Sequence, residues 1–274
     1  MKIDNAILSV DDNDLYASYW PFTSEVWNHF GINPILIHVT ADITKSYPHP
    51  SKFGTVIQIP LIPNLDSAYQ GCIARFLAAA VIHGSNYIFD ADMFLCNRKV
   101  LDRFESVNDN SIITQTRLET IGISQRLLGG LIAGEGETFK RVYEENGIRL
   151  TQDAFWNETI LKQIDQVDFG SYGALRHKVG ADEILLFQCL ANMDDPPPVV
   201  VIANPYPLGR TCVTPAIRPG QDLIQWRFGK KDGESSRWTF EGLREGLYWD
   251  IHPRKDKDKK VTKRIVDIIL GRSD

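Results

Sequence analysis

SAYQGCIARFLAAAVIHGSNYIFDADMFLCNRKV, the stretch from Ser67 to Val100, joins a long apolar segment to a short strand that ends in two aspartates. Apolar and small residues recur every three or four positions before Gly84, which predicts a helix with this glycine at its C-terminal cap. Tyr87 to Phe89 is short and aromatic, which predicts a buried strand, and Asp90 and Asp92 follow it. Because side chains alternate along an extended chain, we expect both aspartates on the same side.

The paired aspartates predict a binding site for a divalent cation. Two carboxylates about 4 Å apart repel by roughly 4 kcal/mol at an effective dielectric constant near 20, so a pair held this close favours a proton or a cation between them. Hard divalent cations take oxygen ligands and often bind phosphates on their open side. The alternative is that one aspartate caps the turn after the strand and the other points into water. The strand and helix that precede the pair favour the metal site.

The rest of the chain alternates between strand and helix patterns. We predict strands at residues 6–10, 35–39, 55–59, 87–89, 111–116, 127–133 and 199–203. We predict further helices at residues 16–30, 100–104, 137–146, 152–164 with Thr151 as N-cap, 181–192 and 261–270. This order predicts an α/β fold with a mostly parallel central sheet and helices on both faces.

A second polar cluster, Asp11-Asp12-Asn13-Asp14, ends the first predicted strand. Open α/β sheets bind their ligands outside the carboxyl ends of the strands. In a parallel sheet these ends lie at one edge, so we expect the Asp11 and Asp90 ends to open on the same edge. The sequence therefore predicts one polar site built from the ends of two strands.

Composition excludes several other classes. The 274 residues are enough to bury a large core, and a net charge of -5 argues against a protein that binds nucleic acid by bulk electrostatics. The four cysteines lack CxxC spacing, which indicates neither a zinc site nor a disulfide framework. No stretch approaches the roughly 20 apolar residues needed to cross a bilayer, and the N-terminal apolar run is short for a signal peptide. We therefore expect a cytoplasmic protein without a transmembrane segment.

Taken together, these motifs resemble the nucleotide-sugar-dependent glycosyltransferases of the GT-A fold. The nearest resemblance is to the retaining family that includes bacterial lipopolysaccharide galactosyltransferases and glycogenin, and it covers residues 6–192. It implies a Rossmann-like GT-A catalytic domain over residues 1–203, with residues 204–274 as a C-terminal extension packed on the same domain. It also implies that Ser9, Asp11 and Asn13 hold the base and ribose of the nucleotide.

The resemblance implies further roles around the two aspartates. Arg75 in the preceding helix would contact the donor, and Asp90-Ala91-Asp92 would bind Mn²⁺ or Mg²⁺ together with the donor diphosphate. Gly130, in the Gly129-Gly130 pair, would flank the sugar or the acceptor; the alternative is that this glycine pair only forms a bulge or a turn. His252 would be a third metal ligand, although the motif around it lacks the glycine usual in that family.

The residue beneath the sugar has two candidates. In the family it is an acidic or amide residue at the start of a helix, which matches either Gln152-Asp153 or Asp182-Glu183. We favour Asp182 and Glu183, because the segment GADEILLFQCL is more similar to the helix openings of several GT-A families. Helix capping alone would also explain acidic residues at these positions.

The resemblance thus implies a metal-dependent hexosyltransferase that uses a nucleotide sugar, with UDP as the expected nucleotide, and a carbohydrate acceptor. Two alternatives are open. The segment FDADMF also resembles phosphatases of the haloacid-dehalogenase type, in which Asp90 would be a nucleophile beside Mg²⁺. The other alternative is a binding module that has the same fold but catalyses no reaction. Arg75 likewise has a second interpretation, as an arginine that only forms ion pairs within the protein.

Overall fold

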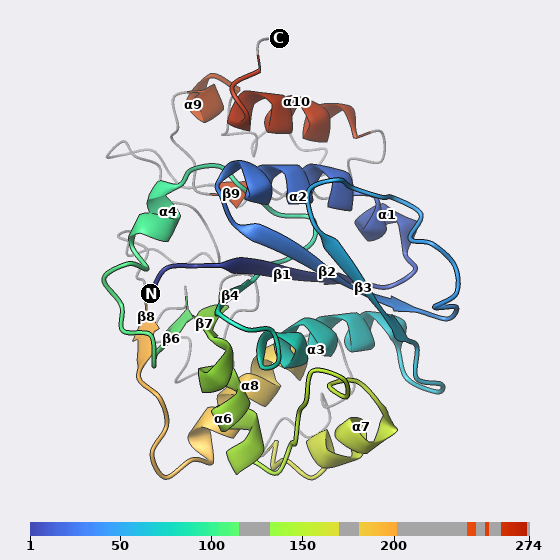
Figure 1. Cartoon of the computed structure of the whole chain (residues 1–274), viewed down its shortest axis with the longest axis vertical. Helices are drawn as coiled ribbons and strands as arrows, with labels where there is room; N and C mark the ends of the chain where they lie inside the picture. The colour runs from blue at the N-terminus through green and yellow to red at the C-terminus, as the bar shows by residue number, and fades with distance from the viewer. Residues whose placement is uncertain (115–131, 170–180, 202–239, 245–249, 252–258, 273–274) are drawn as a thin grey trace, which may run out of the picture.

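A seven-stranded sheet forms the centre of the computed structural model, which describes residues 1–114, 132–169, 181–201, 240–244, 250–251 and 259–272 (Figure 1). The strands in spatial order are β3 (Thr55–Pro60), β2 (Asn33–Thr40), β1 (Asn5–Val10), β4 (Ser85–Ile88), β7 (Ile132–Glu135), β6 (Ile112–Thr114) and β8 (Val199–Val201). Neighbouring strands are parallel except where β7 pairs with β4 and with β6. The predicted mostly parallel α/β sheet is therefore confirmed. A separate two-stranded sheet joins β5 (Phe94–Leu95) to β9 (Asp250–Ile251) in antiparallel orientation.

Helices cover both faces of the sheet, as predicted (Figure 1). One face carries α1 (Asp14–Ala17) and α2 (Trp20–His29), with α4 (Lys99–Asp102) at the side. The other face carries α3 (Ser67–Ala79), α6 (Gly136–Glu145), α7 (Glu158–Ile164) and α8 (Ala181–Ala191). Two further helices, α9 (Phe240–Arg244) and α10 (Lys260–Ile269), lie outside α2. None of the helices in the described ranges has the length and apolar character needed to cross a membrane.

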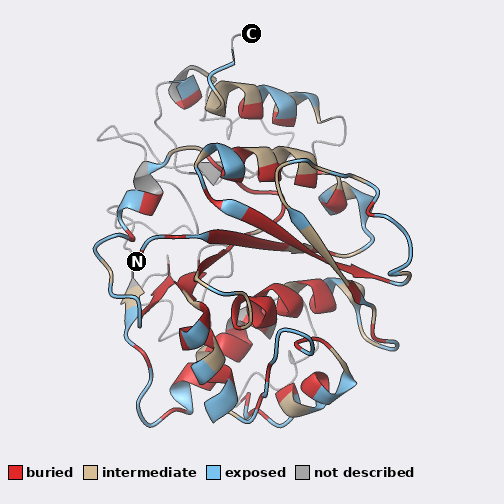
Figure 2. Cartoon of the chain, in the orientation of Figure 1, coloured by how far each residue is buried: buried red, intermediate tan, exposed pale blue. Residues whose placement is uncertain are grey.

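Alternation along the strands divides the core into two clusters, one on each face (Figure 2). In β1, Ile7 packs in the cluster that includes α3, whereas Ala6 and Leu8 pack in the cluster that includes α2. On the α2 side, Trp27 meets the ring of Phe89 edge-on at 4.9 Å between centroids. Both faces are buried, which explains why the strand sequences are almost continuously apolar.

The last described helix packs on an early one. Val266 of α10 belongs to the same apolar cluster as Trp27 of α2. Just before α10, the Lys259 Nζ donates a hydrogen bond to the Leu15 carbonyl at 3.2 Å and lies 3.2 Å from the centroid of the Tyr19 ring. This contact joins residues 244 positions apart in sequence. The predicted division at residue 203 stays a prediction, since residues 202–239 lie outside the described ranges.

Two predicted helices have other bounds in the structure. The helix expected at 16–30 is two helices, and the second begins with Pro21 in its first turn, where a missing N–H costs nothing. The helix expected at 152–164 begins only at Glu158, because the side chain of Asn157 rather than Thr151 caps it, accepting from the Ile160 amide at 3.0 Å.

The prediction that Gly84 caps the C-terminus of α3 was wrong. The cap is Ala80, and Gly84 forms a separate turn with φ of +94°. A Cβ at Gly84 would lie 2.7 Å from a carboxylate oxygen of Asp4, so the position requires glycine for close approach as well as for its backbone angle.

Asparagines connect the starting ends of three strands. Asn86 of β4 donates from Nδ2 to the carbonyls of Ala79 at 2.9 Å and Ile82 at 2.7 Å. Its Oδ1 accepts from Asn5 Nδ2 of β1 at 2.9 Å, and Asn5 Oδ1 accepts from Asn33 Nδ2 of β2 at 3.1 Å. We call Asn5, Asn33 and Asn86 the asparagine ladder. It fixes β1, β2 and β4 relative to one another at their amino ends.

Candidate functional site

The carboxyl ends of β1 and β4 lie side by side, because the two strands are parallel neighbours. The chain leaves β1 toward α2 on one face of the sheet, while the α3 helix that leads into β4 covers the other face. The connections therefore diverge between β1 and β4, which is the position where open α/β sheets bind ligands. The prediction that the Asp11 and Asp90 ends share one edge is confirmed.

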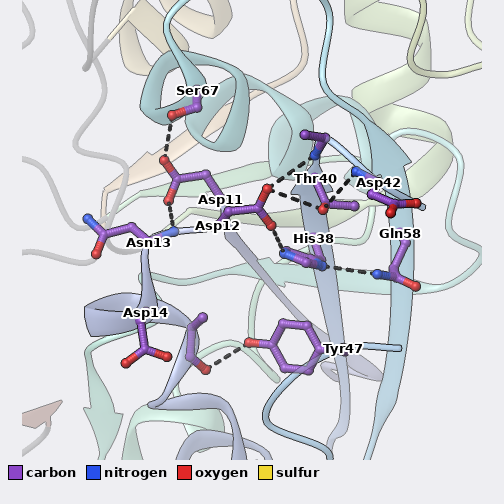
Figure 3. A network of polar contacts seen from close by, with 12 residues as sticks. Asp11, Asp12, Asn13, Asp14, His38, Thr40, Asp42, Tyr47, Gln58 and Ser67 are labelled. Atoms are coloured by element: carbon purple, nitrogen blue, oxygen red, sulfur yellow. Dashed lines mark hydrogen bonds and ion pairs between the residues drawn. The ribbon is translucent and has the colours of Figure 1, made fainter. Parts of the chain in front are cut away.

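The turn after β1 is anchored residue by residue (Figure 3). Asp11 accepts a hydrogen bond from the Ser67 hydroxyl of α3 at 2.7 Å and one from the Asn13 amide at 3.1 Å. The side chain of Asn13 caps α1 by accepting from the Leu15 amide at 3.1 Å. The Ser9 hydroxyl donates to the carbonyl of Gly71 in α3. Ser9 and Asp11 thus hold the end of β1 against α3.

Asp90 and Asp92 lie in a turn and not in an extended strand. β4 ends at Ile88, and the Met93 amide donates to the Asp90 carbonyl at 3.1 Å, which closes a turn around Ala91 and Asp92. The expected alternation along an extended chain was therefore wrong here. Asp92 is buried, with 4% of its surface exposed, whereas the Asp90 side chain is 30% exposed.

Arg75 joins the stretches that the sequence singled out. Its Nη1 donates to the Phe89 carbonyl at 3.1 Å and forms an ion pair with Asp90, while Nη2 donates to Asp182 Oδ2 at 3.1 Å. Arg75 is only 6% exposed. Burial acts to lower the pKa of Arg75, but the two carboxylates raise it well above its ordinary value. Arg75 therefore stays charged and ties α3, the turn after β4 and the start of α8 together.

Asp182 enters this cluster and Asp153 does not. Asp182 is 1% exposed, and its Oδ1 has no hydrogen-bond partner among the described residues. The Nε of Arg75 is also buried and has no hydrogen-bond partner among the described residues. Asp153 lies on an exposed segment before α7. Of the two alternatives that the sequence left open, the structure thus brings the start of α8 to the strand ends, and Glu183 follows Asp182 in that helix.

Asp90 and Asp92 are the two carboxylates for which the sequence predicts a divalent cation. Among the described residues there is no group of three His, Cys, Asp or Glu that could hold a metal ion. Mg²⁺ is commonly bound by one or two carboxylates, with substrate phosphates and water completing its shell, so two carboxylates are enough in number, and the metal stays a prediction. Gly130 and His252 lie outside the described residues, so their expected roles stay predictions.

His38 was missed in the sequence. It lies in β2 near the carboxyl end, and its Nε2 contacts Asp12 Oδ1 at 2.9 Å (Figure 3). A histidine inside an otherwise apolar strand, close to the polar ends of neighbouring strands, is the signal that could have found it. Asp12 had been noted in the motif but received no role.

Comparisons with known proteins give structures but no sequence match. No protein-family model matches the chain, and no curated protein sequence matches it. A search of solved structures finds the galactosyltransferase LgtC in complex with donor and acceptor sugar analogs, at 12% identity and a TM-score of 0.47, over 98% of this chain and 96% of that chain. It also finds an apo structure of WbbM, a bifunctional glycosyltransferase, at 10% identity and a TM-score of 0.39, over 73% of this chain and 39% of that one.

Proposed function

We propose that the protein is a metal-dependent glycosyltransferase that transfers a hexose from a UDP-linked sugar to a glycan or another acceptor. The observation that carries the proposal is the ion-pair cluster of Arg75 with Asp90 and Asp182 at the strand ends. It joins α3 and the turn after β4 to the start of α8, which is 107 positions from Arg75 in sequence, at the edge where open α/β sheets bind nucleotides. Buried charges are costly, so a cluster of this kind at a strand edge is a candidate functional site.

The turn after β1 suits the nucleoside. Asp11 is fixed by Ser67, and each carboxylate oxygen can accept more than one hydrogen bond, so Asp11 can also accept from ribose hydroxyls. The Asn13 amide group offers both a donor and an acceptor, as recognition of a base edge requires. In this proposal Ser9 does not contact the nucleoside but fixes the turn by its hydrogen bond to the Gly71 carbonyl of α3.

The two aspartates after β4 suit the diphosphate. A divalent cation bound there, Mn²⁺ or Mg²⁺, would neutralise the negative charge that develops on the leaving nucleoside diphosphate. Asp90 and Asp92 would hold it, and the bond from Arg75 fixes the position of Asp90. The permanently charged guanidinium adds a positive field at the same edge without needing a direct contact with the phosphates.

The start of α8 suits the transferred sugar. Asp182 Oδ1 and Arg75 Nε are buried polar atoms that lack a partner among the described residues. Such atoms are costly unless a ligand satisfies them, and sugar hydroxyls can both donate and accept. We assign the sugar hydroxyls to Asp182 and the position beneath the anomeric carbon to Glu183, the next residue of the helix.

The test measures binding and turnover together. We expect UDP to raise the melting temperature clearly more with MnCl₂ than without it, and a panel of UDP-hexoses to release UDP slowly even without acceptor. Asp92→Asn should abolish the metal-dependent part of the shift. Asp153→Asn is the matched control, since it removes a carboxylate from an exposed segment and should leave both readouts unchanged.

Two outcomes would contradict the proposal. One is the absence of a metal-dependent shift with UDP, and the other is a shift of full size in Asp92→Asn. Hydrolysis of an aryl phosphate that Asp90→Asn abolishes would favour a phosphatase instead. Binding without UDP release from any UDP-hexose would indicate a binding module.

A further inference from the structure

We propose that Asp12, the middle residue of the turn after β1, is a positioning residue that holds the nucleotide-binding turn by bonding to β2. This inference rests on the proposed function, because the turn is the one to which we assign the nucleoside. Asp12 itself does not contact the ligand in this proposal. It acts through the backbone that it shares with Asp11 and Asn13.

The side chain of Asp12 is bonded to β2 and the residue after it (Figure 3). Oδ1 accepts from His38 Nε2 at 2.9 Å. Oδ2 accepts from the Thr40 hydroxyl at 3.2 Å and from the Ala41 amide at 3.1 Å. In the same view the Asp11 carboxylate points the other way, toward Ser67 of α3. Successive residues of one turn are therefore fixed to opposite sides.

His38 supports this bond from inside the protein. It is 3% exposed, and its ring packs edge-on against Tyr47 at 4.8 Å between centroids. A carboxylate accepts only, so His38 Nε2 carries the hydrogen and Nδ1 of the neutral ring accepts from Gln58 Nε2 of β3 at 3.3 Å. Tyr47 in turn donates to the Ala17 carbonyl at the end of α1 at 2.7 Å. The network thus spans β1, β2, β3 and α1.

The directions of the two carboxylates distinguish the positioning role of Asp12 from the binding role that we assign to Asp11. The Asp12 carboxylate is turned toward residues 38–41, away from α3, whereas the Asp11 carboxylate is turned toward α3. Loss of the Asp12 bonds frees the turn without removing any group that we assign to the nucleoside. The expected effect is therefore weaker donor binding, which raises KM, with little change in kcat for the donor once it is bound.

The experiment compares three variants of the full chain by titration with UDP and MnCl₂. We expect Asp12→Ala to raise the Kd for UDP and the KM for the donor about 10-fold or more, with kcat changed less than about 3-fold. Asp12→Asn should restore most of the affinity. The side-chain oxygen of the asparagine can still accept from Thr40 and Ala41, and its NH₂ group can donate to His38 Nε2 once the imidazole proton has moved to Nδ1. Asp14→Ala removes the same charge from the next helix and should leave the Kd unchanged.

A second measurement does not depend on the nucleotide. Hydrogen exchange at the Leu15 amide, which Asn13 caps, should be faster in Asp12→Ala than in the wild type, with exchange in the middle of β1 unchanged. His38→Ala should have a similar effect, and the double variant should not exceed Asp12→Ala by much, because the two residues act through one bond.

The outcomes are distinguishable. If the wild type binds no UDP, the proposed function fails, and exchange at Leu15 still tests whether Asp12 holds the turn. If Asp12→Ala binds UDP as the wild type does, or lowers only the folded fraction while KM stays constant, Asp12 is not a positioning residue. Unchanged exchange at Leu15 in Asp12→Ala would overturn the inference independently.

Discussion

The two ends of strands β1, β2 and β4 use polar side chains in opposite ways. At the amino ends, the asparagine ladder consists of neutral amides whose hydrogen bonds run to one another and to nearby carbonyls. At the carboxyl ends the same strands lead into Asp12, His38 and Asp90, which are charged or titratable. Here Asp182 Oδ1 and Arg75 Nε are buried without a partner among the described residues.

The two ends of the sheet are therefore held by different kinds of polar contact. Neutral amides with satisfied hydrogen bonds stabilise the fold at modest cost. Buried charges cost much desolvation energy and are seldom kept for stability alone. The amino end therefore aligns the strands, whereas the carboxyl end holds buried charges and, among the described residues, polar atoms without a hydrogen-bond partner. In the proposed function the carboxyl end also binds the ligand, so substitutions at the amino end should change stability alone.

The largest effect should follow removal of the charge at the carboxyl end. Arg75→Met removes the guanidinium from Asp90 and Asp182, and breaking a buried ion pair from one side costs about 3 to 5 kcal/mol in free energy of unfolding. Urea denaturation measures this loss. Arg75→Met combined with Asp182→Leu should recover part of it, because the buried uncompensated carboxylate is gone. A loss below about 1 kcal/mol in the single variant would show that the cluster does not bear on stability.

The amino end should give a smaller loss of stability and no loss of binding. Asn86→Ala removes the donor to two carbonyls and one of the two acceptors of the Asn5 amide, which keeps its bond to the His83 carbonyl at 3.0 Å. Buried unsatisfied groups cost about 1 to 3 kcal/mol each before relaxation. We expect about 3 kcal/mol in total, with the Kd for UDP of the folded protein unchanged. Asn33→Ala, which removes a single bond at an exposed position, is the matched control and should cost less than about 1 kcal/mol. A changed Kd in Asn86→Ala would contradict the separation of roles.

The smallest effect should be a pH dependence at the carboxyl end. Burial lowers the pKa of His38 below its ordinary value of 6.5, against the opposing effect of Asp12 and Asp11. The unfolded chain therefore takes up a proton below pH 6.5 that the folded chain resists. The free energy of unfolding should fall as the pH decreases from 7 to 5, by at most about 1.4 kcal/mol per pH unit for one proton.

His38→Gln removes this titration and keeps a side chain that can donate to Asp12. Urea denaturation at pH 7 and at pH 5 should show a smaller decrease for this variant than for the wild type. The bonds from Ala41 and Thr40, together with His38, lower the pKa of Asp12 below its ordinary value despite burial, so Asp12 titrates below this window. Equal decreases in the two proteins would exclude His38 as the source.

Strand positions could be predicted because the apolar runs are strong and end in charged or turn residues. β1, β2 and β3 were found to within two residues, and the Asp11 and Asp90 ends were placed on one edge. Boundaries that depend on a single hydrogen bond were missed, such as the start of α7 at Asn157 and the turn closed by Met93. Thr151 and Asn157 are both good caps, and only the tertiary fold decides between them.

The site was predicted in part. Its residue types were visible in sequence, but the bond between Arg75 and Asp182 joins positions 107 apart, and no local pattern reports it. For the same reason Asp12 and His38 were not connected, although both were in segments that had been assigned to strand ends. Ligand roles for Ser9, Asp11, Asn13 and Glu183 stay predictions until binding is measured.

The packing of α10 on α2 has a consequence for synthesis of the protein. A ribosome makes α2, which ends at His29, long before α10, which begins at Lys260. While the residues between them are being made, α2 is without α10, so the nascent chain can complete this layer only after α10 has been made. Chaperones that recognise apolar helices would find their target there for that interval.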